Sequence, residues 1–256
     1  MFKKAIVRPP AENFADGLTT ADLGAPDFKR ALEQHAGYCR ALEQCGLALK
    51  CLEPDAAHPD STFVEDAAVL TEHSAILTHP GAPSRQGEVA AISPALRQFY
   101  TRFHRIAPPG TLDGGDICEA GSHFFIGVSE RTNEEGARQL AGFLAGEGFT
   151  SSVVDIRGVP GILHLKSGIA YLGDERLVLI DTLAGRAAFQ SYEIVRVEPT
   201  ENYAANCVRV NDYVLLAAGY PRLEATLRRL GYAPLVLDMS EYQKMDGGLS
   251  CLSLRF

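Results

Sequence analysis

Apolar residues recur along the chain in one repeated order: two short runs with a turn between them, a helical pattern, and a third run. In the clearest copy, residues 206–217 predict two strands around an Asn-Asp turn. Pro221 opens the helix that follows, in which leucines recur at helical spacing (Leu223, Leu227 and Leu230). Residues 233–237 predict the closing strand, so this segment forms a hairpin, a helix and one more strand.

Three further segments repeat this order. In residues 116–156 a hairpin precedes a helix, for which Thr132 and Glu135 fit a capping box, and a strand follows at 152–156. Residues 67–100 predict strands at 67–70 and 75–78 and a helix within 88–100. Residues 168–180 predict strands at 170–172 and 177–180.

The chain ends complete a fifth unit. A helix over residues 27–45 lies between strands at 4–7 and 47–51, and residues 249–256 can pair with the first strand. The pattern therefore predicts five units of roughly fifty residues each around an axis. The expected fold class is α/β, a five-bladed propeller of ββαβ units with pseudo-fivefold symmetry. A doubly wound sheet is the alternative, but it would not need a hairpin at every step.

Length and charge limit the classes of function. The 256 residues are enough for a sizeable core, and we expect one catalytic domain over residues 1–256. A formal charge of −8 argues against general nucleic-acid binding, which needs a basic surface. The apolar start is interrupted at Arg8-Pro9-Pro10, too early for a secretory signal, and no apolar run is long enough to span a bilayer.

The six cysteines form no CxxC pair and no zinc-site spacing with histidine. Cysteines without an export signal indicate a reducing compartment, so we expect a cytoplasmic protein. Four of them occur in helix or strand patterns and are interpreted as structural (Cys39, Cys45, Cys118 and Cys207).

Cys251 and His164 are the candidate reactive residues. Cys251 follows two glycines that permit a tight turn, and strand alternation places it on the face opposite the neighbouring leucines. A cysteine taken alone is more often an inert small residue. His164 lies in an apolar segment that predicts a strand, where an imidazole needs a hydrogen-bonding partner. It is therefore either a satisfied core histidine or an acid/base group.

Two acidic clusters interrupt apolar segments. Glu65 and Asp66 are adjacent, so at least one should face inward, and Asp113 and Asp116 flank two glycines. Turn formation alone would explain each cluster. Together they could instead bind a guanidinium through charge-assisted hydrogen bonds. Two arginines, Arg85 in a loop and Arg131 before the expected helix cap, could complement them, or be solvated surface residues.

Six short segments occur in an order that resembles the dimethylarginine dimethylaminohydrolases, of the guanidine-modifying enzyme superfamily. The resemblance covers essentially the whole chain and includes a loop at residues 16–19. The segments are Phe63-Val-Glu-Asp66, Leu112-Asp-Gly-Gly-Asp116, Arg131-Thr-Asn133, Leu163-His-Leu-Lys166, Tyr203-Ala-Ala-Asn206 and Asp246-Gly-Gly-Leu-Ser-Cys251.

The resemblance implies the pentein fold, no organic cofactor and no catalytic metal. It assigns Cys251 as the nucleophile, His164 as the acid/base and Asp113 as the acid that orients it, where some family members have glutamate. The residues that it assigns to the substrate are a lid (Leu18), an acidic and apolar wall around the guanidinium (Asp60, Phe63, Glu65 and Asp66), a carboxylate grip (Arg85 and Arg131) and a frame for the α-amino end (Asp246).

The implied reaction is hydrolysis of asymmetric dimethylarginine or monomethylarginine to citrulline and an amine through a covalent intermediate on Cys251. An arginine deiminase or an amidinotransferase could use the same residues, and a non-catalytic binding or redox-sensing protein is the more remote alternative. The expected partner is a small-molecule substrate, with no nucleic acid or membrane. Both a homodimer and a monomer remain open.

Overall fold

The structure is a computed structural model that describes residues 1–256, and its strands form five three-stranded sheets. Each sheet is mixed, because its central strand pairs antiparallel with one neighbour and parallel with the other. In chain order from the N-terminus the sheets are β15-β1-β2, β3-β4-β5, β6-β7-β8, β9-β10-β11 and β12-β13-β14. Each sheet therefore corresponds to one of the repeated segments in the sequence.

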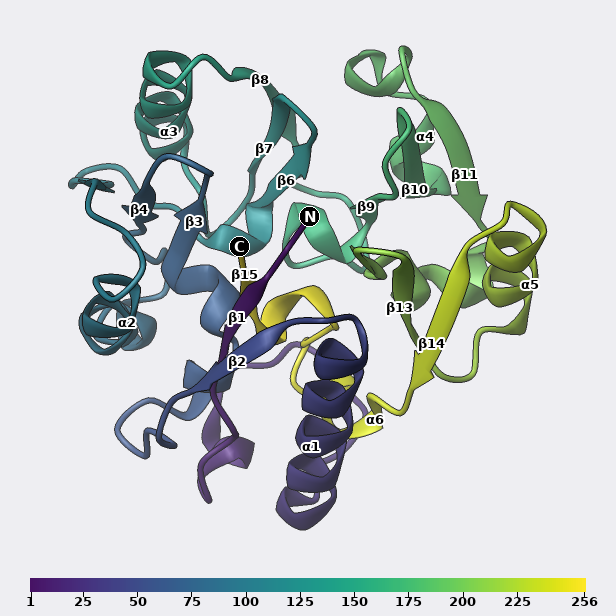
Figure 1. Cartoon of the computed structure of the whole chain (residues 1–256), viewed down its shortest axis with the longest axis horizontal. Coiled ribbons are helices and arrows are strands. Elements are labelled where there is room, and N and C mark those ends of the chain that lie inside the picture. Colours follow the sequence, from purple (N-terminus) through teal and green to yellow (C-terminus); the bar gives the residue numbers. More distant parts are fainter. The chain divides into compact units, whose positions relative to one another are not determined.

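The strands are short and are labelled in Figure 1 where there is room. Their bounds are β1 Lys4–Val7, β2 Ala48–Cys51, β3 Ala68–Leu70, β4 Ala75–Leu77, β5 Phe103–Arg105, β6 Ile117–Ala120, β7 His123–Val128, β8 Thr150–Asp155, β9 Ile169–Tyr171, β10 Arg176–Ile180, β11 Glu193–Val197, β12 Val208–Val210, β13 Tyr213–Ala217, β14 Ala233–Leu237 and β15 Leu254–Arg255. The α-helices are α1 Phe28–Gln44, α2 Glu88–Leu96, α3 Glu134–Gly146, α4 Asp181–Ala184, α5 Pro221–Arg229 and α6 Ser240–Gln243.

The chain divides into two compact units. The first unit combines residues Met1–Glu65 with Cys207–Phe256, and the second spans Asp66–Asn206. The first holds the sheets centred on β1 and β13, and the second holds those centred on β4, β7 and β10. The boundary separates Glu65 from Asp66, so the acidic pair that the sequence singled out contributes one carboxylate to each unit.

The first unit is built around its chain ends. β15 pairs antiparallel with β1, and β2 pairs parallel with β1 on the other side (Figure 1). Asp27 caps α1 by accepting a hydrogen bond from the backbone N–H of Arg30, so the helix begins one residue after the predicted start. Burying one face of α1 stabilises the helix more than its intrinsic propensity does.

The second unit has a continuous apolar core between its first two sheets. α3 packs on β7 and β8 and buries Leu140 and Leu144 against Phe124 and Ile126. Its N-cap is Asn133, whose side chain accepts a hydrogen bond from the backbone N–H of Gly136. The capping box predicted from Thr132 and Glu135 is therefore wrong, because Thr132 makes other contacts that are described below.

Two further local predictions were wrong. His164 does not lie in a strand but caps a short 3-10 turn, Leu165–Ser167. Cys251 also lies in a 3-10 turn, Ser250–Leu252, and only Leu254–Arg255 forms strand at the C-terminus. Both turns are closed by local backbone hydrogen bonds instead of sheet pairing. The N–H of Ser167 donates to the carbonyl of His164, and the N–H of Cys251 donates to the carbonyl of Gly248. None of the helices has the length and hydropathy that crossing a bilayer requires.

Candidate active site

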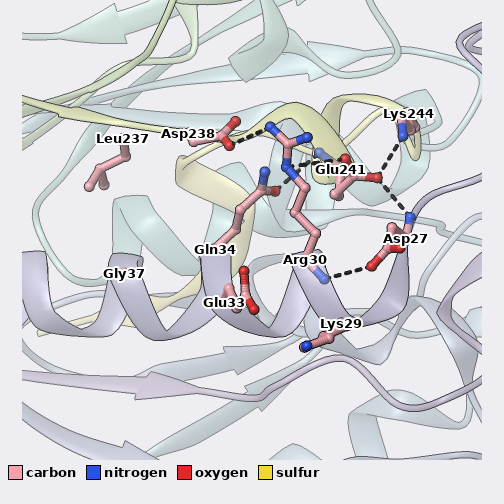
Figure 2. Close-up of a pocket in the computed structure, with 10 residues that line it drawn as sticks. All are labelled: Asp27, Lys29, Arg30, Glu33, Gln34, Gly37, Leu237, Asp238, Glu241 and Lys244. Carbon is pink, nitrogen blue, oxygen red and sulfur yellow. Dashed lines mark hydrogen bonds and ion pairs between the residues drawn. The ribbon is translucent and has the colours of Figure 1, made fainter.

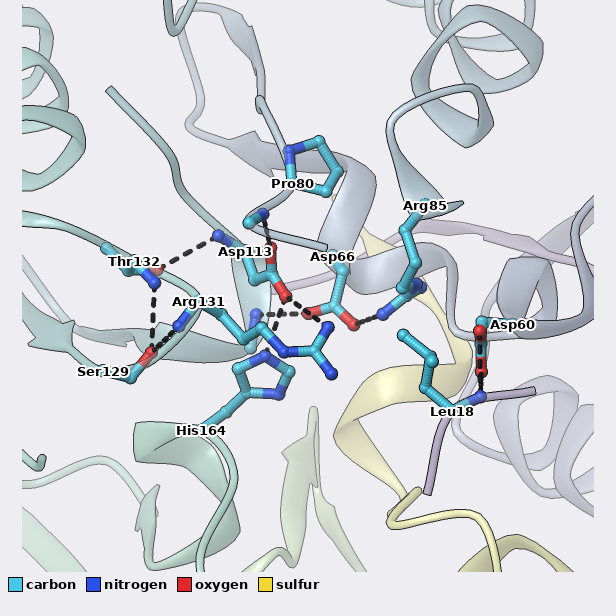
Figure 3. A network of polar contacts seen from close by, with 12 residues as sticks. Leu18, Asp60, Asp66, Pro80, Arg85, Asp113, Ser129, Arg131, Thr132 and His164 are labelled. Atoms are coloured by element: carbon cyan, nitrogen blue, oxygen red, sulfur yellow. Dashed lines mark hydrogen bonds and ion pairs between the residues drawn. The ribbon is translucent and has the colours of Figure 1, made fainter. Parts of the chain in front are cut away.

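The second unit brings together four of the residues predicted for the site. His164 Nε2 lies 3.0 Å from Asp113 Oδ2, and both side chains are buried. Asp66 lies beside them: a carboxylate oxygen of Asp66, a carboxylate oxygen of Asp113 and a ring nitrogen of His164 all lie within 4.8 Å of one another. Arg131 extends over this group, with its guanidinium 3.9 Å from Asp113 (Figure 3).

Glycines allow the backbone to pass close to these side chains. A Cβ on Gly115 would lie 2.8 Å from the His164 ring and from Asp66, so any larger residue would displace them. The backbone N–H of Gly115 instead donates to Asp66 at 2.7 Å. Gly81 donates in the same way to the other carboxylate oxygen of Asp113, at 2.9 Å. The two acids are therefore fixed by backbone groups before any ligand binds.

Asp113 is thus held from two sides. Its Oδ1 accepts the N–H of Gly81, and its Oδ2 faces the imidazole of His164. A carboxylate in this position favours one ring orientation and one tautomer, and it stabilises the imidazolium. This is the geometry expected of an acid that orients a catalytic base.

The buried carboxylates control the protonation of His164. Burial alone would lower its pKa, but the charges of Asp66 and Asp116 and the bond to Asp113 outweigh burial and raise the pKa to about 9. In Asp66, burial opposes ionisation, yet the charges of His164 and Arg85 lower the pKa to about 2. We therefore expect a charged imidazolium beside a charged carboxylate at neutral pH.

Asp116 was singled out in the sequence only as a member of an acidic cluster, and its function there was missed. Its Oδ2 accepts hydrogen bonds from the hydroxyls of Ser129 and Thr132, each at 2.7 Å. Its Oδ1 accepts the backbone N–H of Leu165 at 2.9 Å. Burial raises the pKa of Asp116 to about 6. Because Leu165 follows His164 directly, Asp116 fixes the turn that presents the imidazole.

Arg85 lies in a buried ion network. Its Nη1 donates to Asp66 at 2.5 Å, and its Nε and Nη2 donate to the two oxygens of Glu88 at 2.9 and 2.8 Å. Glu88 was not singled out from the sequence, although its place three residues after Arg85 suits an ion pair at the start of a helix. The side chain of Arg131, by contrast, retains an exposed fraction of 16%.

The internal contacts account for the acids that could otherwise suggest a metal centre. Asp66, Asp113 and His164 have suitable donor atoms for a divalent cation. However, Arg85 and Gly115 already donate to Asp66, and Gly81 donates to Asp113. A cation at this point would have to compete with a guanidinium and an imidazolium for the same oxygens.

The first unit carries the remaining predicted residues. Cys251 is partly buried, its backbone N–H donates to the carbonyl of Gly248, and its sulfur lies 3.8 Å from the hydroxyl of Ser250. That hydroxyl donates to Glu65 at 2.9 Å. The turn that bears the thiol is therefore connected directly to one of the acids predicted to surround the guanidinium.

The predicted lid is tied down at its start by side-chain oxygens. Both carboxylate oxygens of Asp60 accept from the backbone N–H of Leu18, at 3.1 and 3.2 Å, and the leucine side chain is exposed. Asp246 accepts from the backbone N–H and the hydroxyl of Thr20, at 2.5 and 2.9 Å. Asp246 adopts a left-handed φ of 55°, which is uncommon for a residue with a Cβ.

Phe63 lies in an aromatic cluster of the first unit. Its ring centroid is 6.0 Å from that of Phe14 and 6.2 Å from that of Tyr242. A Cβ on Gly247 would collide with the Phe63 ring, so glycine is required at that position. The cluster fixes Phe63 in one orientation, which suits its predicted role as a rigid apolar wall.

No protein-family model matches the chain. A curated relative is the N(G),N(G)-dimethylarginine dimethylaminohydrolase of Pseudomonas aeruginosa, which is 47% identical over 257 residues and is covered completely, as is this chain.

Solved structures agree with that similarity. A cysteine-to-serine variant of the Pseudomonas aeruginosa enzyme in complex with citrulline matches with a TM-score of 0.97 at 46% identity, over all of both chains. A histidine-to-glycine variant of a dimethylarginine dimethylaminohydrolase, as an adduct with S-methyl-L-thiocitrulline, matches with a TM-score of 0.96, also at 46% identity over all of both chains. The fold class expected from the sequence, a five-bladed α/β-propeller of ββαβ units, is confirmed.

Proposed function

The chain belongs to the dimethylarginine dimethylaminohydrolase family, and from that premise we propose that Cys251, His164 and Asp113 carry its reaction. The reaction is hydrolysis of Nω-methylated arginine to citrulline and dimethylamine or methylamine. The buried pair of His164 and Asp113 is the observation that carries the assignment, because it is the arrangement that an acid/base histidine needs. We propose that residues 1–256 act as one catalytic domain, because the similarity to the curated relative covers the whole of both chains.

The first step is attack by sulfur on the guanidinium carbon. This carbon is a poor electrophile, since its positive charge is delocalised over three nitrogens. A thiolate is a far better nucleophile than water, and a neighbouring cation favours thiolate over thiol. The raised pKa of His164, about 9, keeps the imidazole charged at neutral pH, so it can supply both that charge and a proton.

Collapse of the addition product breaks the bond between carbon and the methylated nitrogen. His164 gives its proton to this nitrogen, and dimethylamine leaves. An amidino-thioether then joins the sulfur of Cys251 to the former guanidinium carbon. The neutral imidazole next accepts a proton from water, whose oxygen bonds to the same carbon. Cleavage of the carbon–sulfur bond releases citrulline and restores the thiolate. The hydroxyl proton of the adduct passes through solvent to the released dimethylamine, and His164 keeps the proton that it took from water.

Three carboxylates are proposed to hold the cationic end of the substrate. Asp60, Glu65 and Asp66 are all buried acids, which form strong charge-assisted hydrogen bonds with a guanidinium. Phe63 supplies the apolar wall. Holding a planar reactant rigidly against a nucleophile can contribute several orders of magnitude in effective concentration.

The amino-acid end of the substrate is assigned to the two arginines and the lid. We assign its carboxylate to Arg131 and Arg85, and its α-ammonium to Asp246, with Leu18 over the site. The exposed fraction of Arg131 supports its assignment more directly than that of Arg85, whose donors contact Asp66 and Glu88.

The relatives support the covalent route. Citrulline, the product, is bound in a variant of one relative that lacks a cysteine thiol. S-methyl-L-thiocitrulline forms an adduct with a dimethylarginine dimethylaminohydrolase variant that lacks a histidine imidazole. Those residue types are the two that the proposal needs for bond formation and proton transfer.

Replacement of the nucleophile tests the proposal. Cys251→Ser should keep the fold and lower kcat by about 10³-fold or more, because an alcohol at this pH is a weak nucleophile. Cys51→Ser, at an exposed cysteine, is the matched control and should keep full turnover. Substantial activity in a folded Cys251→Ser protein would reject the mechanism.

Analysis of the products distinguishes the proposed hydrolysis from the related deiminase and amidinotransferase reactions. Dimethylamine released from asymmetric dimethylarginine supports the proposal. Ammonia released from arginine would indicate a deiminase, and transfer of the amidino group to an added amine would indicate an amidinotransferase. The formal charge of −8 supports a small cationic substrate and no nucleic-acid partner, and we place the protein in the cytoplasm.

A further inference from the structure

Arg255 contacts the backbone on both sides of the proposed nucleophile. It lies in β15, where its backbone is registered against Ala5 of β1. Its Nη1 donates to the carbonyl oxygen of Ser250 at 3.2 Å and to that of Ser253 at 3.0 Å. The same nitrogen donates to the Ser253 hydroxyl at 2.7 Å. One guanidinium therefore fixes the residue that precedes Cys251 and the residue two positions after it.

The other end of the same guanidinium reaches the acidic wall. Nη2 of Arg255 donates to Oε1 of Glu65 at 3.2 Å, and the Ser250 hydroxyl donates to Oε2 of Glu65 at 2.9 Å. Arg255, Glu65 and Ser250 thus form a closed ring of contacts, which we call the Arg255 ring. Glu65 and Arg255 are 190 positions apart in the sequence and are both largely buried.

The fork of an arginine is what this ring requires. A guanidinium presents its N–H groups in a fixed plane, so it can bind backbone carbonyls with one nitrogen and a carboxylate with another. A lysine ammonium keeps the charge but is a point donor on a flexible stem. Lysine at this position could satisfy either the turn or Glu65, and not both in the same geometry.

We infer that Arg255 is a positioning residue that fixes the sulfur of Cys251 relative to the carboxylate of Glu65. The inference rests on the proposed function, in which Glu65 holds the guanidinium that Cys251 attacks. Reacting atoms must approach to about 3–3.5 Å in alignment, and a misplacement of about 1 Å can cost roughly 10²-fold in rate. The Arg255 ring sets this geometry within the first unit without contributing a reacting atom.

Kinetics of Arg255→Lys give the first test. We expect kcat to fall about 10²-fold, while KM changes much less, because the substrate still meets the same groups in a less productive geometry. Arg228→Lys is the matched control. Arg228 makes an exposed ion pair with Glu224 at 2.8 Å, and its replacement by lysine should leave both constants unchanged. An unchanged kcat in folded Arg255→Lys overturns the inference.

Alkylation of Cys251 gives a second test that needs no turnover. A haloacetamidine carries a cationic amidine, whereas iodoacetamide is neutral, so their rate ratio reports how well Glu65 guides a cation to the sulfur. We expect the wild-type protein to prefer the amidine and Arg255→Lys to lose most of that preference. If the wild type fails to hydrolyse asymmetric dimethylarginine but Arg255→Lys still loses the preference, the proposed function fails while the positioning role stands.

Ser250→Ala tests the ring from its third side and keeps the inference falsifiable if Arg255→Lys does not fold. The change removes one hydroxyl and its bond to Glu65 from a small buried side chain. Loss of one such bond corresponds to about tenfold in kcat, with a smaller loss of the alkylation preference than in Arg255→Lys. A folded Ser250→Ala protein with wild-type kcat and preference contradicts the inference.

Discussion

Two ion networks in this protein use the same residue types in opposite surroundings. In the second unit, Asp66, Arg85 and Glu88 form contacts of 2.5–2.9 Å, with side-chain exposures of only 3–5%. In the first unit, Arg30 binds Asp238 at 2.9 Å, but these side chains are 54% and 49% exposed.

The exposed network lines an open groove of about 550 Å³ beside α1 (Figure 2). Water screens the charges of Arg30 and Asp238 there, so this pair can be lost at little cost. In the buried network no water can replace a lost partner, so removing one ion leaves the others uncompensated. Ion pairs of similar length can therefore differ widely in what their loss costs. The buried network controls the protonation and position of side chains at the site, whereas the Arg30–Asp238 pair is a surface contact.

Replacing Arg85 and Arg30 by methionine should give the largest difference in stability between the two networks. Arg85→Met should lower the free energy of unfolding by about 3–5 kcal/mol, because it leaves the carboxylates of Asp66 and Glu88 buried without their cation. Arg30→Met removes the exposed 2.9 Å pair with Asp238, while Lys244 still pairs with the buried Glu241 at 2.6 Å, so the urea midpoint should stay unchanged within error. Similar losses in both variants would show that burial does not separate the two networks.

The pH dependence of stability gives the next largest effect. The pKa of His164 is raised from 6.5 to about 9 in the folded protein, so its stabilising contribution is complete below pH 6.5 and is lost as the pH rises through about 9. That contribution is roughly 3 kcal/mol. Urea unfolding of the wild type and of His164→Asn across this range should show a difference that shrinks toward high pH. A difference that grew with pH would contradict a charged imidazolium.

A smaller effect is expected from Glu88→Gln. The amide keeps the shape of the side chain but removes the negative charge that faces Arg85, which should cost about 1–3 kcal/mol in the free energy of unfolding. Thermal and urea denaturation would measure it. Glu88→Gln as stable as the wild type would mean that Asp66 alone satisfies Arg85.

The smallest effect on stability is expected in the exposed network. Asp238→Asn removes the charged partner of an exposed arginine. In the wild type, Arg30 and the Ser240 backbone lower the pKa of Asp238 to about 2 despite partial burial, which shows only that the two charges interact. Solvent and salt replace this partner readily, so we expect no resolvable change in the urea midpoint at 0.15 M salt. A loss of stability as large as that of Glu88→Gln would show that the Arg30–Asp238 pair also stabilises the fold.

Repeated elements were predictable from the sequence, while the local geometry of the site was not. Helical spacing of leucines and the turn residues between short apolar runs identified the units, including the segment from Val208 to Leu237. The helix expected over residues 27–45 is observed as α1, Phe28–Gln44. These features depend on neighbouring residues, so a single sequence contains them.

The errors occurred where distant residues decide the backbone. Thr132 looked like a helix cap, but its hydroxyl is used by Asp116, sixteen positions earlier. The apolar residues around His164 and Cys251 suggested strands, whereas both lie at 3-10 turns. Asp116 and Arg255 were not assigned a function, because their partners lie close only in the folded chain.

For the predicted site residues, the roles came from the family resemblance and the contacts came from the structure. The family resemblance supplied their roles, and the structure adds that Asp66, Asp113 and His164 come together and that Arg85 contacts Asp66. The assignments of Leu18, Asp60, Phe63, Asp246 and the substrate-binding arginines remain predictions of the proposed function. A carboxylate's ligand cannot be read from a sequence when internal donors compete for the same oxygens.

Mass spectrometry of an acid-quenched reaction with asymmetric dimethylarginine tests the central claim most directly. We predict a covalent species on the peptide that contains Cys251, with the mass of the substrate less dimethylamine, and dimethylamine with citrulline in solution. The same reaction with Cys251→Ser should give neither product. Citrulline formed without any adduct on Cys251, and formed equally by Cys251→Ser, would contradict the account.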